Sequence, residues 1–175
     1  VESLLNWQWP DGGWNCDKHP EASHSSFHES FIPLRALNAF WQASGDERVK
    51  AARDRAAERF LSRSLYKNPA TGQAIMPVFT KPAYPAYWHY DFLYGLRAMD
   101  ECGLLPDPRC VDALDLLESK RLPDGGFGAE TRYYQYSQKI QTGHSLVDWG
   151  GTSTRYFNPF ITVEALCILK AASRI

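Results

Sequence analysis

The sequence predicts an all-α fold, specifically part of an α/α toroid with about three pairs of inner and outer helices. An Asp-Gly-Gly-aromatic turn occurs twice, at residues 11–14 and 124–127. Amphipathic segments with apolar residues three or four positions apart flank these turns, and no strand pattern competes with them. The segments alternate between mainly apolar and charged on one side, which is the alternation expected of an inner and an outer layer of helices.

The first predicted pair of helices begins at Ser26. Ser26 and Glu29 have the spacing of a capping box, and the apolar stripe that follows runs to Trp41. Gly45 is expected to end this helix, and Asp46 is expected to cap the next one. The second helix has one apolar side and one densely charged side, which assigns it to the outer layer.

Three further helices are expected after a connection rich in proline and glycine. The third carries Trp88 on its apolar stripe and ends at Gly103. Asp107 is followed by a proline and should cap the fourth helix. A long polar and aromatic loop then leads to Asn158, also followed by a proline, which should open the last helix.

The helices assigned to the inner layer align with one another. Residues 28–37 match residues 90–99, and a shorter third match places Glu164 opposite both Arg35 and Arg97. The repeat unit is therefore one helix pair. A buried Glu164 needs a partner, and either arginine could supply it, so we interpret these three residues as structural.

Composition and charge limit the partners and the compartment. The 175 residues include 19 basic and 20 acidic ones, and no basic cluster is interleaved with aromatics, so no nucleic-acid partner is expected. No apolar run approaches the roughly 20 residues that cross a bilayer, so we expect no transmembrane segment and a cytoplasmic location. The four cysteines form no CxxC pair, which suits a reducing compartment.

Residues 8–14, Gln-Trp-Pro-Asp-Gly-Gly-Trp, resemble the QW motif of squalene and hopene cyclases. The Gly-Gly-Phe copy at residues 125–127 resembles the turns of protein prenyltransferase β subunits. The chain thus resembles the superfamily of terpenoid cyclases and protein prenyltransferases. This resemblance implies a ring with about twice as many helix pairs around an apolar cavity. Residues 1–175 are therefore expected to be a single domain that is a fragment of a longer toroid, or half of a ring completed by a homodimer.

Candidate catalytic residues lie near the starts of the predicted inner helices. The repeat alignment puts Glu29, Asp91 and Asn158 in matching places, and parallel inner helices would bring them to one mouth of the cavity. Two carboxylates facing a closed cavity could act as acid and base or hold a metal. Acids in a first helical turn also serve as caps. We name Asp91, Glu29 and His89 as the catalytic candidates.

Aromatic residues supply the candidate ligand contacts. Tyr87, Asp91 and Tyr94 recur at helical spacing, and Trp88 starts the neighbouring apolar stripe. Such a surface lines a cavity or packs between neighbouring helices. Trp149 and Arg155 lie in the long loop before the last helix, and long loops in compact domains often bind ligands.

A zinc ion is implied only by the resemblance. His28 falls where prenyltransferase β subunits carry a zinc histidine, just after a Gly-Gly-aromatic turn. The Asp-x-Cys partner of that family is expected on the preceding inner helix, which this sequence does not include, and reading the site one helix later gives His89-Tyr90-Asp91, which lacks the cysteine. A hydrogen-bonded or exposed histidine is the alternative. The Asp-x-Asp-Asp acid motif of squalene-type cyclases and the Asp-rich magnesium motif are absent as well.

The leading functional hypothesis is an isoprenoid-handling toroid, related to terpenoid cyclases or prenyltransferases, that binds an apolar small molecule in a central aromatic-lined cavity. It favours an enzyme without identifying a reaction. One alternative is a carbohydrate-active enzyme similar to polysaccharide lyases or glycosidases, which an open, wet groove would favour. Another is a non-catalytic helical scaffold, which is favoured if Glu29, Asp91 and His89 point apart or serve as caps.

Overall fold

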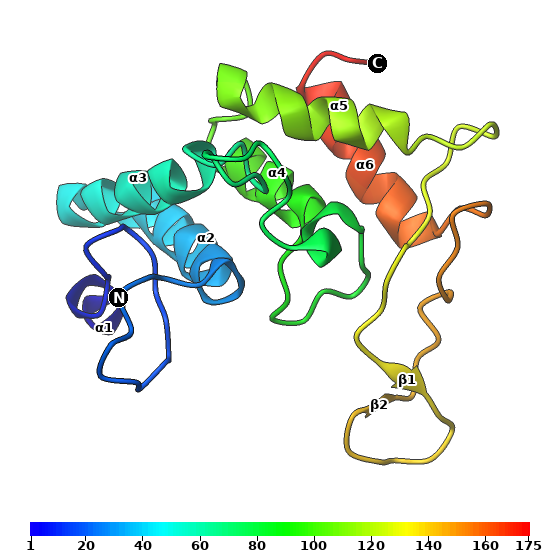
Figure 1. The fold of residues 1–175 in the computed structure, drawn as a ribbon, viewed down its shortest axis with the longest axis horizontal. Coiled ribbons are helices and arrows are strands. Elements are labelled where there is room, and N and C mark those ends of the chain that lie inside the picture. Colours follow the sequence, from blue (N-terminus) through cyan, green and yellow to red (C-terminus); the bar gives the residue numbers. More distant parts are fainter.

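The computed structural model describes residues 1–175 and consists mainly of helices joined by long loops (Figure 1). The α-helices are α1 (Glu2–Asn6), α2 (Phe27–Ser44), α3 (Glu47–Leu61), α4 (Phe92–Glu101), α5 (Val111–Ser119) and α6 (Pro159–Ala171). Two 3₁₀ helices, η1 (Pro77–Thr80) and η2 (Pro108–Cys110), and a parallel pair of short strands, β1 (Gln135–Tyr136) and β2 (His144–Ser145), complete the chain. The all-α prediction is confirmed.

Helices α2, α4 and α6 form a row in which α4 packs against both neighbours. Helix α3 packs on α2, and α5 packs on α4. The three row helices run in the same direction, so their N-terminal ends lie at the lower edge of the view in Figure 1. The long loop with β1 and β2 projects from that edge. These residues form an open row of helices with a second layer, and they do not form a closed ring.

One apolar core joins the layers. Leu34 and Leu37 of α2, Phe60 of α3 and Leu96 of α4 belong to a cluster of 31 buried residues. They recur at the helical spacing that puts apolar side chains on one face. Complete burial of such side chains stabilises the fold by about 1.5–3 kcal/mol each. The packing of this core fixes how the row helices sit beside one another.

Helix α4 starts later than the sequence suggests. The predicted apolar stripe began at Trp88, but the helix begins at Phe92 because Asp91 caps it. Tyr87 has a positive φ of 53° and lies outside the helix. The proposed helical stripe of Tyr87, Asp91 and Tyr94 is therefore wrong. The predicted caps of α3 and α6, Asp46 and Asn158, are confirmed.

The capping box predicted at the start of α2 does not form. The Ser26 side chain caps no backbone N–H group. Glu29 instead accepts a hydrogen bond from the backbone N–H of Cys16, with 3.3 Å between Oε1 and N. The hydroxyl of Ser30 donates to the Ser26 carbonyl at 2.5 Å. Side chains of α2 thus bind the preceding loop and the carbonyl of the N-cap residue, and no capping box forms.

The two Asp-Gly-Gly-aromatic turns are held by the same contacts. The backbone N–H of Trp14 donates to Ser30 Oγ, and that of Phe127 donates to Thr162 Oγ1, both at 2.9 Å. The Thr162 hydroxyl also donates back to the Phe127 carbonyl at 3.1 Å, and Ser30 Oγ lies 3.3 Å from the Trp14 carbonyl oxygen. Both aromatic side chains are buried. A hydroxyl group on the following inner helix therefore holds each turn by hydrogen bonds.

These contacts also correct the repeat alignment. The backbone N–H of Ser26 donates to the Trp14 carbonyl at 2.9 Å, and that of Asn158 donates to the Phe127 carbonyl at 2.8 Å. Ser26, Asp91 and Asn158 are the N-cap residues of the three row helices. Asp91 and Asn158 thus match Ser26, and Glu29 lies three residues further along its helix.

Ion pairs cross the row of helices. Arg35 of α2 binds Glu101 of α4 at 2.6 Å, and Arg97 of α4 binds both Glu101 at 3.1 Å and Glu164 of α6 at 2.5 Å. The prediction that an arginine partners Glu164 is confirmed, and the partner is Arg97. All four side chains are roughly a third exposed, so each pair contributes about 0–1 kcal/mol.

Candidate functional site

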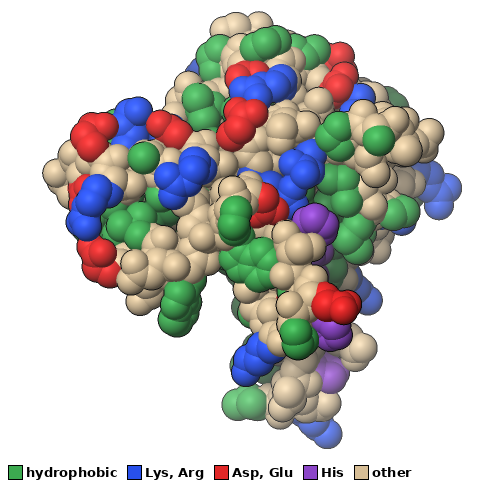
Figure 2. All heavy atoms as spheres, turned by 60° about the vertical axis from the view of Figure 1, so that its left-hand side comes forward, with side chains coloured by type: hydrophobic (Ala, Val, Ile, Leu, Met, Phe, Trp, Pro, Cys, Tyr) green, Lys and Arg blue, Asp and Glu red, His purple; other side chains and the backbone are tan.

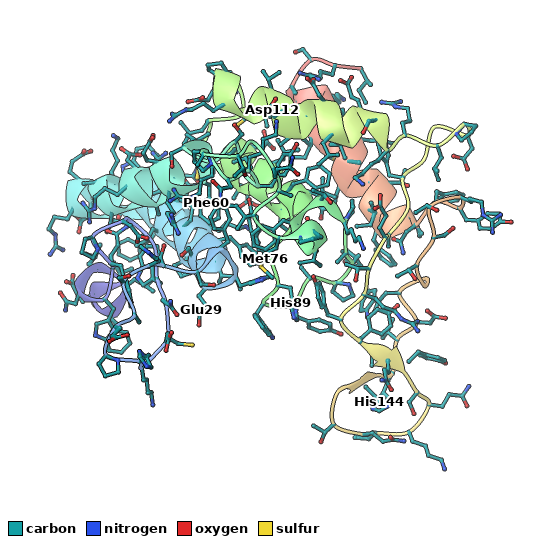
Figure 3. The ribbon with its side chains drawn as sticks, in the orientation of Figure 1. Glu29, Phe60, Met76, His89, Asp112 and His144 are labelled. Atoms are coloured by element: carbon teal, nitrogen blue, oxygen red, sulfur yellow. The ribbon has the colours of Figure 1, made fainter.

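A cavity of about 290 Å³ opens at the N-terminal end of α4. It lies between the segment that precedes α4 and the long loop before α6. Its lining consists of aromatic, histidine and glycine residues: Tyr87, Trp88, His89, Tyr133, Tyr134, Gly143 and His144. We call it the aromatic cavity. Figure 2 shows hydrophobic side chains, in green, interspersed with charged ones over one face of the molecule, and histidine side chains, in purple, in the centre and lower part of that face. Figure 3 labels two of its residues, His89 and His144.

A stack of three rings forms one wall of the aromatic cavity. The His89 ring lies between Trp88, with ring centroids 3.9 Å apart, and Tyr133, whose nearly parallel ring has its centroid 3.5 Å away. His89 Nδ1 lies 3.2 Å from the Ala86 carbonyl oxygen. Burial lowers the pKa of His89 below its ordinary value of 6.5. The imidazole is therefore uncharged at neutral pH, and both of its faces are covered.

His28 reaches this stack from α2. Its ring meets Trp88 and His89 edge to face, at centroid distances of 5.6 and 5.8 Å. Its Nδ1 accepts a hydrogen bond from the backbone N–H of Tyr90 at 2.8 Å. Burial, and then the neighbouring His89, lower the pKa of His28. His28 is thus a neutral hydrogen-bond acceptor that joins α2 to the chain entering α4.

The residues of this chain offer His28 no further metal ligands. Within residues 1–175, no three His, Cys, Asp or Glu side chains lie close enough together to hold a metal ion. The Nδ1 lone pair of His28 is already taken by a backbone N–H. The donor set therefore does not fit zinc, which takes four ligands in structural sites and three in catalytic ones.

Asp91 is buried beneath the aromatic cavity and caps α4. One carboxylate oxygen accepts from the N–H groups of Leu93 and Tyr94 at 2.9 and 3.1 Å, and the other accepts from Ala83 N–H at 2.9 Å. Burial raises the pKa of Asp91 to about 7, although these hydrogen bonds oppose that shift. Because its oxygens are engaged by the backbone, Asp91 has a structural role in the cap.

Glu29 belongs to a different cavity. That cavity has a volume of about 870 Å³ and is lined by Trp7, Trp9 and Trp14 together with polar residues of the N-terminal segment. Asp91 and His89 do not line it, and Glu29 does not line the aromatic cavity. Figure 3 shows Glu29 on the side of α1 and His89 on the side of β1. The three catalytic candidates therefore do not share one cavity.

The remaining predicted ligand contacts divide between packing and exposure. Trp149 packs edge to face on Tyr84 and Phe160, with centroids 5.5 and 5.2 Å away. Its backbone N–H donates to Tyr134 Oη at 3.1 Å, so Trp149 anchors the long loop. Tyr94 Oη likewise accepts from a backbone N–H group, at 3.2 Å. Arg155 is exposed and forms no ion pair.

Sequence reasoning missed the residues that the long loop contributes. Tyr133, Tyr134 and His144 line the aromatic cavity, and the Tyr133 hydroxyl is buried without a hydrogen-bond partner. The only signal was the density of tyrosines at residues 133–136 in a loop of unusual length. Which side chains of such a loop meet α4 depends on its path, which no local pattern specifies.

Comparisons with protein-family models, curated proteins and solved structures find no match to this chain. The resemblance to terpenoid cyclases and prenyltransferases therefore stays a prediction from its motifs. No helix combines the length and the apolar character that spanning a membrane requires.

Proposed function

We propose that this chain forms an arc of an α/α toroid and binds an apolar ligand of the isoprenoid type in the aromatic cavity. The observation that carries the proposal is the lining of this cavity, which includes no Lys, Arg, Asp or Glu. Tyr87 and Trp88 are 51% and 58% exposed there. Concave, mainly apolar surfaces with few polar groups are typical of small-molecule sites.

Apolar exposure along the row helices supports the same proposal. Ile32 and Phe40 of α2 and Val163 of α6 are large apolar side chains that are more than 40% exposed. Exposed apolar surface of this kind marks ligand or protein contacts when it is contiguous. In a completed toroid, row helices with such side chains would line an apolar central cavity.

The proposal concerns binding rather than a reaction. Glu29 lies in another cavity, and the carboxylate of Asp91 is occupied by three backbone N–H groups. The neutral His89 ring is covered on both faces by Trp88 and Tyr133. These residues therefore do not assemble an acid and base pair for catalysis. This arrangement also meets the expectation of the scaffold alternative.

Carbohydrate binding is the second candidate, because of the larger cavity around Glu29. Trp7 is 73% exposed at its edge, and polar residues such as Asn15 and Lys18 line it beside Trp9. An open tryptophan surface surrounded by hydrogen-bonding groups suits stacking on a sugar ring. This cavity is separate from the aromatic one, so the two candidates predict different sensitive residues.

Calorimetric titration of the purified chain separates the candidates. We expect a fifteen-carbon prenyl alcohol to bind saturably, and a soluble hexasaccharide such as cellohexaose not to bind. Trp88→Ala should weaken the alcohol about tenfold or more, since it removes aromatic contact area, and the matched variant Trp7→Ala should leave it unchanged. Binding of the hexasaccharide that Trp7→Ala abolishes would favour the carbohydrate candidate. Absence of binding by either ligand would favour the scaffold.

A further inference from the structure

A third cavity, of about 370 Å³, carries an excess of positive charge. It lies between the start of α2, the end of α3 and the loop that follows α3. Its lining is Ser25, Ser26, Phe27, His28, Arg59, Arg63, Asn68, Pro69, Ile75, Met76 and Phe79. Two arginines and no Asp or Glu belong to this set. We call it the arginine cavity.

Arg59 is held rigidly in this cavity with part of its guanidinium group free. The residue is only 8% exposed. Its Nε donates to Ser25 Oγ at 2.8 Å, and its Nη2 donates to the Ser25 carbonyl at 3.0 Å, whereas Nη1 donates to no group of the protein. Asp11 also forms an ion pair with Arg59, with 3.5 Å between its Oδ2 and Nε. The Nη1 group has no acceptor in the chain and is available to one that a ligand supplies.

Arg63 adds a second cation to the arginine cavity, and unlike Arg59 it has no carboxylate partner. It forms no ion pair, and its Nη1 donates only to Ser62 Oγ at 3.1 Å and to the Arg59 carbonyl at 3.4 Å. Burial lowers the pKa of Arg59 most, and the positive charge of Arg63 lowers it further. The two guanidinium groups thus repel each other, and an anion between them would relieve that repulsion.

The start of α2 presents further donors to the same cavity. The backbone N–H groups of Phe27 and His28 donate to no acceptor in the chain, and the Ser26 side chain caps neither. The N-terminal end of an 18-residue helix also carries a partial positive charge. Together with Arg59 and Arg63, these amides provide the mixed set of donors that binds phosphate oxygens well.

We propose that the arginine cavity is an oxyanion site that binds a phosphate or diphosphate group. Arg59 Nη1 and Arg63 supply the charge, and the first amides of α2 with the Ser26 hydroxyl supply hydrogen bonds. The site is distinct from the aromatic cavity, and its occupation does not depend on the binding of an apolar ligand there.

Titration with inorganic pyrophosphate and with inorganic phosphate, at fixed ionic strength and pH 7, tests this proposal. We expect one pyrophosphate per chain and a rise in melting temperature on binding. Arg63→Gln should weaken pyrophosphate at least tenfold, and Arg63→Lys should weaken it less, because lysine keeps the charge but not the fork of donors. Arg121→Gln is the matched control, since Arg121 is exposed and also lacks a carboxylate partner.

Three results would overturn the oxyanion site. The first is the absence of saturable pyrophosphate and phosphate binding to the unmodified chain. The second is an affinity of Arg63→Gln equal to that of the unmodified chain. The third is equal weakening by Arg63→Gln and Arg121→Gln, which would indicate attraction to the overall charge rather than to this cavity. The melting temperature of Arg63→Gln without ligand shows whether that variant is folded.

Discussion

At the scale of single residues, Asp91 and Asn158 occupy the same N-cap position but make opposite second contacts. Each uses one oxygen to accept from two backbone N–H groups of its helix. The other oxygen of Asp91 accepts from Ala83 N–H at 2.9 Å, whereas Asn158 Nδ2 donates to the Trp149 carbonyl at 2.7 Å. The surroundings therefore require an acceptor at one site and a donor at the other.

Exchanging these two caps should destabilise both sites. Asp91→Asn places an N–H₂ group against a backbone N–H, and Asn158→Asp places an oxygen against a carbonyl oxygen. We expect each to lower the free energy of unfolding by about 1–3 kcal/mol, the effect of an unpaired buried polar group. Urea unfolding measures this. Asp46→Asn, at a cap that is only partly buried, should change it less. A neutral result for either exchange would show that the second contact is unimportant.

Asp91 should also make the stability depend on pH. Its pKa is about 7 in the folded chain and 3.8 ordinarily, so the folded state holds the proton more tightly. The unfolding free energy should therefore fall as pH rises from about 4 to about 7, by at most ~1.4 kcal/mol per pH unit. The lowered pKa values of His28 and His89 act in the opposite direction.

Comparison of the unmodified chain with Asp91→Asn isolates this contribution, since both proteins keep the two histidines. Urea unfolding at pH 4.5, 5.5, 6.5 and 7.5 should give a shallower decline for the variant. Parallel curves would mean that Asp91 keeps the same protonation state in the folded and unfolded chains.

At the scale of elements, the two glycine turns have the same backbone but different surroundings. Gly12 and Gly125 both have a positive φ, 91° and 84°. A Cβ atom on Gly12 would lie 2.4 Å from the Arg55 carbonyl oxygen of α3, whereas one on Gly125 would meet nothing within 4 Å. The first turn is pressed against its outer helix, and Gln8 reinforces that contact by donating to the Gly12 and Ala52 carbonyls, each at 2.8 Å.

Alanine substitutions should separate backbone strain from close packing. Gly125→Ala introduces only the unfavourable φ, which costs about 1–2 kcal/mol. Gly12→Ala introduces the same strain and a clash with backbone, so we expect a further loss of about 1–3 kcal/mol. Thermal unfolding of the two variants measures the difference. Equal losses would mean that α3 can move away from the turn without penalty.

The sequence predicted helix boundaries well where a cap acts locally. Asp46 and Asn158 bind amides two or three residues away, so their patterns are readable. The start of α2 at Ser26 was predicted correctly. Its capping box was not, because Ser30 binds Trp14, sixteen residues earlier in the chain. Contacts between distant parts of the chain also limited the prediction of the candidate site. His89 was identified, but its stacking partner Tyr133 comes from a loop whose path depends on tertiary contacts.

At the scale of the whole molecule, the chain is a row of parallel helices with cavities near the row's N-terminal ends. The apolar core holds α2, α4 and α6 together. The linked ion pairs of Arg35, Glu101, Arg97 and Glu164 align these helices along their axes but contribute little to the free energy of unfolding. The aromatic cavity depends on this arrangement because one wall precedes α4 and the other lies in the loop before α6. Function is therefore expected at this end of the row.

Photoaffinity labelling shows which cavity holds the apolar ligand. A prenyl alcohol that carries a benzophenone group would be photolysed with the purified chain, and the modified residues would be mapped by mass spectrometry. We predict saturable labelling of Tyr87, Trp88 or Tyr133 that an excess of the unmodified alcohol prevents. Labelling that is unsaturable, or that falls on Trp7 and Trp9 instead, would contradict the assignment of the aromatic cavity as the ligand site.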